Sequence, residues 1–280
     1  MAVLLALAAA LVYGAGDFSG GIATRRAPAM TVVLASQLLG GLLLALLAFA
    51  VGGDALAPED VAWAAMAGIA GGGALALLYH GLATGIMSLV APVTAVVAAA
   101  VPVLAGYGFG ERPSKVAAAG MVVALGAILL ISRPATDEHG AGRLDAKTLA
   151  LALGAGLGFG LFFIGLERTS PGTGLWPLVP ARGAAALGFV ILALATRTSV
   201  RLPKGLGRWV LAAAVCDTAA NALYLLAVRR GLLAIVAVLT SLYPASTLVL
   251  ARVVLGERLA RVQQLGLAGA AMAVVLISVG

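Results

Sequence analysis

Charged residues are scarce in this sequence, and their scarcity excludes a soluble protein. Asp, Glu, Lys and Arg make up 10% of the 280 residues, whereas hydrophobic residues make up 62% and the mean hydropathy is +1.10. A soluble domain carries about 25% charged residues to cover its water-facing surface. Helices of about 20 apolar residues that cross a bilayer fit this composition instead. We therefore predict an all-α integral membrane protein with the lipid bilayer as its solvent.

Cysteine and aromatic residues are also few. The one cysteine, Cys216, lies in an apolar segment, so disulfides and zinc sites built from cysteine are excluded. No basic run is interleaved with stacking aromatics, so the net charge of +7 is expected to face lipid headgroups rather than nucleic acid. No Walker A motif occurs, which excludes ATP as the direct energy source. We expect neither a cofactor nor a metal ion.

Ten apolar runs, bounded by charge, Gly or Pro, predict ten transmembrane helices. The longest polar connection, 133–147, separates the fifth helix from the sixth and divides the chain into two units, 1–132 and 148–280. The first run lacks the basic start of a secretory signal peptide and is expected to stay in the mature protein. The predicted helices span 2–23, 30–51, 61–84, 86–109, 115–132, 148–168, 175–196, 208–229, 232–254 and 262–279.

The second unit repeats the first at an offset of 146 positions. Gly110-Glu111-Arg112 returns as Gly256-Glu257-Arg258, and Tyr13 of the first predicted helix corresponds to Phe159 of the sixth. Five helices per copy is an odd number, so the two copies must cross the membrane in opposite directions. The sequence therefore predicts two inverted five-helix repeats with a site near the middle of the bilayer.

These features resemble the EamA-type transporters of the drug/metabolite transporter superfamily. The resemblance is carried by the Gly-Glu-Arg after each fourth helix, by the Gly near the start of each fifth helix, and by Tyr13–Phe18, which is similar to an aromatic–glycine signature. It covers essentially the whole chain and implies a ten-helix transporter of small molecules, with the substrate left open. Arg182 stands where the family often carries an arginine, and Gln37 lies near the matching position of the first copy.

The third predicted helix carries a second point of resemblance. Tyr79-His80 is similar to a Tyr-His pair that lines the central cavity of aromatic amino-acid exporters in this family. Those exporters also carry aromatic residues in the fourth helix, whereas 95–103 has none. This departure speaks against an aromatic substrate.

Two observations on membrane orientation conflict. The resemblance implies that both termini lie in the cytoplasm. The positive-inside rule favours both termini outside, because the loops on the side of the termini carry fewer basic residues than the loops on the other side. The terminal side holds Arg112, Lys115, Arg168, Arg229 and Arg230, and the other side holds Arg25, Arg26, Arg133, Arg143, Lys147, Arg197, Arg201, Lys204, Arg208, Arg252, Arg258 and Arg261.

Two acidic residues, Asp17 and Asp217, lie well inside predicted spans, whereas nearly all the other acids fall in loops or at helix ends. A carboxylate at membrane depth costs several kcal/mol unless it is neutral, paired or facing water, so both are candidates for substrate binding or proton coupling. A hydrogen-bonded packing contact is the alternative. Asp217, Asn221 and Tyr224 follow at i, i+4 and i+7 and share one helix face, which is expected to point inward. His80 adds a group that titrates near neutral pH.

Arg182 is the basic residue that lies well inside a span, where it is expected to pair with a carboxylate, bind an anionic substrate or extend along its helix. We favour pairing. Glu111 and Glu257 are motif residues at helix ends, to which we assign a structural or gating role. Further candidates for lining a cavity, each with a packing role as the alternative, are Tyr13, Thr94, Trp176 and Tyr243.

We interpret the chain as a secondary active transporter of the plasma membrane that exports a small amino-acid-like or drug-like metabolite by alternating access, with protons as the candidate coupling ion. A monomer contains both halves of the site, so a dimer is not required. One alternative is a non-transporting or lipid-handling protein with the same fold. A second is an intramembrane aspartyl protease, because Gly14–Asp17 matches Gly-x-Gly-Asp and Asp217 could complete a dyad. The second alternative leaves the repeat unexplained, and we predict that the protein is not an enzyme.

Overall fold

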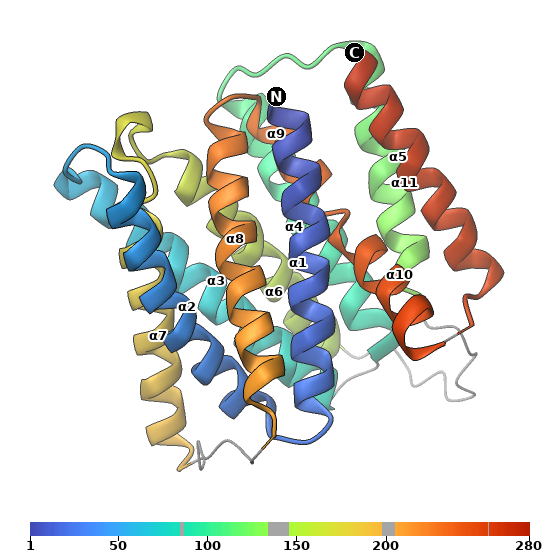
Figure 1. Ribbon diagram of the computed structural model, residues 1–280. Helices are drawn as coiled ribbons and strands as arrows, with labels where there is room; N and C mark the ends of the chain where they lie inside the picture. The colour runs from blue at the N-terminus through green and yellow to red at the C-terminus, as the bar shows by residue number, and fades with distance from the viewer. Residues whose placement is uncertain (85–86, 134–145, 198–204, 257) are drawn as a thin grey trace.

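The computed structural model describes residues 1–84, 87–133, 146–197, 205–256 and 258–280, with the side chains of 79, 82–84 and 87–89 left out (Figure 1). In these ranges every regular element is a helix, and nine segments are long and apolar enough to cross a membrane, of which one, Leu233–Leu255, contains two helices. The helices are α1 (Ala2–Thr24), α2 (Ala29–Val51), α3 (Pro58–Thr84), α4 (Met87–Gly108), α5 (Lys115–Ile131), α6 (Ala146–Glu167), η1 (Pro171–Thr173), α7 (Leu178–Ala195), α8 (Gly207–Val228), α9 (Leu233–Thr240), α10 (Tyr243–Leu255) and α11 (Arg261–Val279).

The predicted ten-helix order is confirmed, with one difference in the ninth span. The sequence predicts one continuous helix over 232–254, but this span consists of α9 and α10, which are separated at Ser241 and Leu242. The physical reason is Pro244, which has no N–H to donate to the carbonyl of Thr240 and whose ring disfavours a continuous helix. Pro92 and Pro102 lie inside α4, and α4 nevertheless continues through both.

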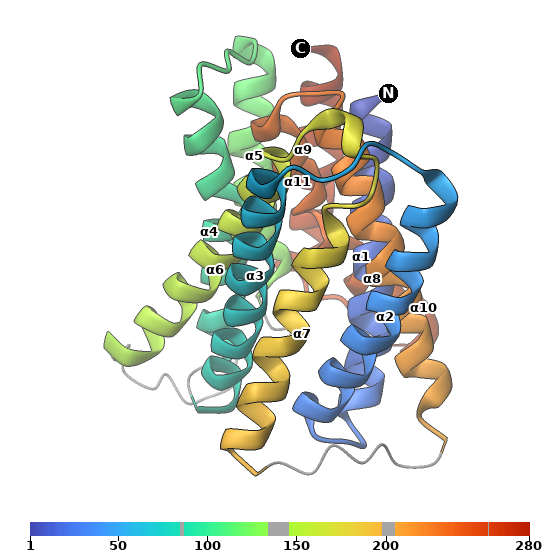
Figure 2. The same cartoon turned by 90° about the vertical axis from the view of Figure 1, so that its left-hand side faces the viewer.

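The two copies are interleaved in an inverted arrangement. α1 packs against α8 just as its counterpart α6 packs against α3, and α1 packs on α9 and α10 just as α6 packs on α4 (Figures 1 and 2). α5 and α11, the last helices of the two copies, pair with each other. Each helix therefore makes its main contacts with helices of the other copy. The N- and C-termini both lie at the same end of the bundle, which we call the terminal end (Figure 1).

Glycines at equivalent positions mark this two-fold relation. A Cβ added at Gly120 would lie 2.8 Å from Ile277, and a Cβ added at Gly266 would lie 2.8 Å from Ile131. Gly266 and Ile277 lie 146 positions after Gly120 and Ile131. The two contacts are therefore related by the pseudo-two-fold axis between the copies. Such close approach of helix backbones is typical of membrane helices with small residues at the interface.

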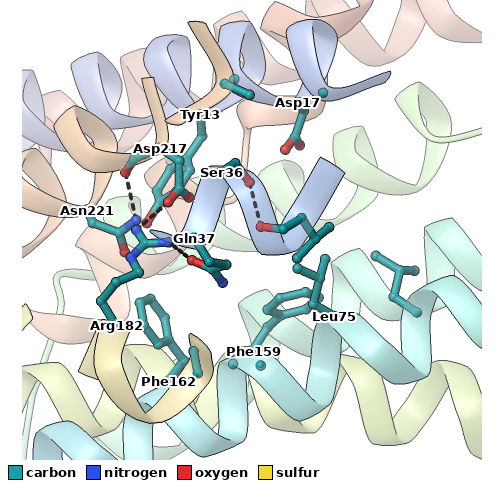
Figure 3. Close-up of a pocket in the computed structure, with 18 of the residues that line it drawn as sticks. Tyr13, Asp17, Ser36, Gln37, Leu75, Phe159, Phe162, Arg182, Asp217 and Asn221 are labelled. Carbon is teal, nitrogen blue, oxygen red and sulfur yellow. Dashed lines mark hydrogen bonds and ion pairs between the residues drawn. The ribbon is translucent and has the colours of Figure 1, made fainter. Parts of the chain in front are cut away.

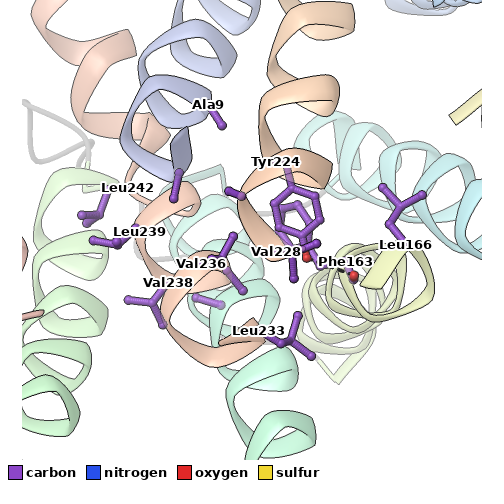
Figure 4. Packing of buried hydrophobic residues seen from close by; sticks show 14 of the residues in the cluster. Ala9, Phe163, Leu166, Tyr224, Val228, Leu233, Val236, Val238, Leu239 and Leu242 are labelled. Atoms are coloured by element: carbon purple, nitrogen blue, oxygen red, sulfur yellow. Dashed lines mark hydrogen bonds between the residues drawn. The ribbon is translucent and has the colours of Figure 1, made fainter. Parts of the chain in front are cut away.

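A buried apolar cluster fills much of the bundle, and Figure 4 shows part of it. Its largest member is Tyr224, which is fully buried and packs with its ring centroid 4.4 Å from that of Phe163. Leu233, Val236 and Leu239 of α9 are also fully buried or nearly so. Large apolar side chains are exposed on the outer faces of the helices, among them Leu42 of α2, Leu187 of α7 and Val253 of α10. This distribution fits a bundle with lipid as its outer solvent.

Candidate functional site

A cavity of about 410 Å³ lies inside the bundle, between helices of both copies (Figure 3). Its walls come from α1, α2 and α3 of the first copy and from α6, α7 and α8 of the second, with smaller contributions from α4 and α10. The lining includes six glycines on α1 and α3, of which Gly20 and Gly21 have nothing within 4 Å of an added Cβ, whereas the other four lie against neighbouring helices. It extends to Thr24 and Val32, near the connection between α1 and α2. The cavity therefore runs from the middle of the bundle toward the end opposite the termini.

An ion pair joins three helices on one wall of the cavity. The guanidinium of Arg182 on α7 donates to the carboxylate of Asp217 on α8 and to the side-chain oxygen of Gln37 on α2 (Figure 3). The side chain of Arg182 is 11% exposed and that of Asp217 is 39% exposed, so the pair is partly desolvated and its carboxylate faces the cavity. Asn221, one turn further along α8, donates from Nδ2 to the Asp217 carbonyl at 2.7 Å and also lines the cavity.

A second carboxylate stands apart from this pair. Asp17 lies on α1, is exposed to the cavity and has no hydrogen bond or ion pair within the described ranges (Figure 3). Tyr13, one turn earlier, and Tyr243, at the start of α10, also line the cavity, with their ring centroids 6.3 Å apart. Because Asp217 pairs with Arg182 rather than with Asp17, the two carboxylates do not form the shared-proton dyad that an aspartyl protease requires.

Several candidates lie away from the cavity lining. Thr94 is buried and donates to the Ala152 carbonyl at 3.1 Å, because α4 packs directly on α6. Tyr224 donates to the Phe163 carbonyl at 3.0 Å within the apolar cluster, since the inward face of α8 continues past the closed end of the cavity. Trp176 packs against the same cluster, and His80 is exposed at the end of α3. The side chain of Tyr79 lies outside the described residues.

Other residues that line the cavity could not be predicted from their charge or from a sequence motif. Phe159 and Phe162 on α6 and Leu75 on α3 form an apolar part of the wall that extends away from Arg182 (Figure 3). The internal repeat could have identified Phe159 as a lining residue, because Phe159 corresponds to Tyr13, which lines the other side of the cavity. The repeat could also have identified Gln37, which lies within one position of the counterpart of Arg182. Polar residues that meet across the pseudo-two-fold axis therefore come from equivalent places in the two copies.

Glu111 stabilises the start of α9. Its two carboxylate oxygens accept hydrogen bonds from the backbone N–H groups of Leu233 at 2.5 Å and of Ala234 at 2.9 Å. A carboxylate at this position satisfies two unpaired donors and interacts favourably with the helix dipole. The Gly-Glu-Arg of the first copy thus contacts a helix of the second copy. Glu257 lies outside the described residues.

We expect a Glu111→Gln variant to lose about 1–3 kcal/mol of stability, because glutamine offers one acceptor oxygen to two backbone donors and carries no charge. Thermal unfolding of the purified protein in detergent measures this loss. The matched control is Arg112→Gln at the neighbouring exposed residue, for which a change within about 0.5 kcal/mol is expected. Equal unfolding temperatures for the two variants would contradict the assigned role.

Hydrogen bonds at the terminal end join the start of α3 and the end of α8 to the connection between α6 and α7. Asp60 accepts from the backbone N–H of Ser170 at 2.7 Å, which joins the start of α3 to the connection between α6 and α7. Arg229, just beyond α8, donates to the Ser170 carbonyl at 3.1 Å, to the Thr173 hydroxyl at 2.9 Å and to the Gly174 carbonyl. Partial burial lowers the pKa of Arg229, and the Asp60 carboxylate opposes this shift. A guanidinium remains charged even so.

Known proteins support the same architecture. One solved structure, titled "Crystal structure of protein", superposes with a TM-score of 0.81 at 15% identity, with 99% of this chain and 96% of that chain covered. This likeness concerns the fold alone. A search of curated proteins found no match. The EamA-like transporter family matches residues 1–133 and 175–279, which is most of the sequence. The chain therefore belongs to the EamA-like transporter family and is a membrane transporter of the drug/metabolite transporter superfamily.

Proposed function

We propose that this transporter exports a small amino-acid-like metabolite across the plasma membrane. The observation that carries the proposal is the separation of charges around the cavity, with Arg182 on one wall and, on another, the carboxylate of Asp17, which has no ion pair among the described residues. A zwitterion carries the complementary charges on its carboxylate and ammonium groups. A volume of about 410 Å³ also lies within the usual range of small-molecule sites.

Each part of such a substrate has a complementary partner. Its carboxylate would replace that of Asp217 at the guanidinium of Arg182, where a planar fork of donors favours a carboxylate. Its ammonium group would meet Asp17, with the ring of Tyr13 nearby for a cation–π contact. Its side chain would rest on the apolar wall of Phe159 and Phe162. Since both copies contribute to these contacts, one chain is sufficient for binding.

Proton exchange through Asp17 would supply the driving force. The carboxylate binds either the substrate ammonium or a proton, so the two occupants exclude one another. Alternating access requires the cavity to open at one end while it is closed at the other, and the loop contacts of Asp60 and Arg229 suit the closed end. Protons that enter from the acidic side would then release the substrate there. Asp217 is less suited to this role because it is paired with Arg182.

An Asp17→Asn variant is expected to lose the effect of a pH gradient on transport, because asparagine cannot take up a proton. Liposomes with purified protein would be loaded with a mixture of amino acids, and mass spectrometry would measure efflux with and without a pH gradient. Wild-type protein should release one class of zwitterion at least about tenfold faster into an acidic exterior, a ratio equivalent to about 1.4 kcal/mol.

The matched control is Glu59→Gln, which removes an exposed carboxylate in the first turn of α3, away from the cavity. It should retain the full gradient effect. Gradient-driven efflux from the Asp17→Asn protein would refute proton exchange at this residue. No movement of any compound by well-folded wild-type protein would favour the lipid-handling alternative.

A further inference from the structure

The break in the ninth span holds two buried hydroxyl groups without partners. Thr240 is 0% exposed and Ser241 is 2% exposed, and neither side-chain oxygen has a hydrogen bond within the described part of the chain. Leaving a buried hydroxyl unpaired costs about 1–3 kcal/mol. Two such groups on adjacent residues indicate a ligand, because buried polar groups almost always have a partner.

The backbone at the break adds further oxygen atoms. Pro244 has no N–H, so it cannot donate to the carbonyl of Thr240 as a helical residue at that position would. Ser241 donates its N–H to the Ala237 carbonyl at 2.9 Å, and Leu242 donates to the Leu239 carbonyl at 3.2 Å, which tightens the last turn of α9. The carbonyl end of a helix is the negative end of its dipole. The break therefore holds two unpaired hydroxyls and a carbonyl that lacks its usual helical N–H donor, at the negative end of α9.

The first copy does not reproduce this arrangement. Thr94 corresponds to Thr240 at the repeat offset, but its hydroxyl donates to the Ala152 carbonyl and α4 is continuous there. Ala95 stands in place of Ser241, so the second hydroxyl is also missing. The unpaired oxygens are thus a feature of the second copy, at a point where α4 of the first copy is continuous and the second copy has two helices.

The cavity gives a ligand access to the break. Ser241 lines the cavity, and so does Tyr243 at the start of α10. The hydroxyl of Thr240 is fully buried, which admits only a very small ligand such as a monatomic ion or a water molecule. Hard cations prefer oxygen ligands, and divalent ions such as Ca²⁺ and Mg²⁺ take carboxylates among them. Uncharged oxygens at a helix carbonyl end instead suit a monovalent cation, as at the broken helices of secondary transporters.

We propose that the break between α9 and α10 binds a Na⁺ ion. The hydroxyl oxygens of Thr240 and Ser241 and the carbonyl oxygen of Thr240 are the protein ligands, and water from the cavity completes the shell. The ion offsets the dipole at the end of α9 and joins α9 to α10, both of which pack on α1. None of the proposed ligands is a titratable side chain, so ion binding at the break can be tested separately from the substrate and from proton exchange at Asp17.

Binding of radioactive ²²Na⁺ to the purified full-length protein in detergent tests the proposal, with choline chloride keeping the ionic strength constant. The two test variants are Thr240→Val, which keeps the shape of threonine without its hydroxyl, and Ser241→Ala. Thr94→Val is the control, since it removes the equivalent hydroxyl from the first copy. Saturable binding should weaken by at least about tenfold in both test variants, as expected for the loss of one ligand, and persist in the control.

Thermal unfolding separates loss of binding from loss of folding. Na⁺ should raise the unfolding temperature of wild-type protein and of Thr94→Val, because a ligand stabilises the state that binds it, and should have little effect on the two test variants. In choline, Thr240→Val should be at least as stable as wild type, since it removes an unpaired hydroxyl. Absence of saturable ²²Na⁺ binding by folded wild-type protein, equal stabilisation by K⁺, or retained binding in both test variants would overturn the proposal.

Discussion

An Arg182→Gln variant is expected to lose transport almost completely and to unfold more easily than wild type. Arg182 is the one basic side chain among the described lining residues, so its loss leaves the carboxylate of a substrate without a cationic partner. The carboxylate of Asp217 also loses its counter-charge. Breaking a fully buried pair costs about 3–5 kcal/mol, and the partial exposure of Asp217 reduces this to about 1–3 kcal/mol. Liposome efflux and thermal unfolding measure the two effects.

A double variant separates these two effects. Arg182→Gln combined with Asp217→Asn replaces the ion pair by neutral amides that can bond to one another and to Gln37. Its unfolding temperature should return close to that of wild type, while efflux stays reduced by at least about a hundredfold, or about 2.7 kcal/mol. Wild-type efflux from the double variant would show that the ion pair only stabilises the bundle.

Most of the fold could be predicted from the sequence because lipid imposes simple rules on it. A span needs about 20 apolar residues, and an odd number of spans per copy requires an inverted repeat. The break at Ser241 and Leu242 was not predicted, because proline inside a membrane helix has several outcomes. Pro92 and Pro102 leave α4 continuous, whereas Pro244 accompanies a separation into two helices. The difference depends on packing against other helices, which the local sequence does not contain.

The charged members of the candidate site could also be predicted, for an energetic reason. A charge at membrane depth must face a partner or water, so Asp17, Arg182 and Asp217 had to point inward. Uncharged candidates carry no such constraint. Thr94 and Tyr224 both satisfy their hydroxyls on backbone carbonyls of α6, which a helical-wheel argument cannot anticipate.

Interleaving of the copies explains why the site has unequal halves. Because each helix packs mainly on the other copy, a cavity wall always combines one helix from each. Asp217 lies on the second copy, and its counterpart at the repeat offset is Gly71, which lines the same cavity and lies against the ring of Phe162, 3.0 Å from an added Cβ. A charged position of one copy thus corresponds to a glycine of the other, so the two copies contribute different chemistry to the cavity.

A Gly68→Ala variant is expected to destabilise the protein by about 3 kcal/mol, because a Cβ at this position would overlap the carbonyl group of Ala181. That carbonyl is backbone and cannot move without separating α3 from α7, and the separation would displace the neighbouring Arg182. Gly73→Ala on the same helix is the matched control, since nothing lies within 4 Å of its added Cβ. The control should be stabilised by about 0.5–1 kcal/mol, as for alanine in a helix interior. Thermal unfolding and efflux would both report the effect, and equal stability of the two variants would mean that α3 and α7 do not cross at Gly68.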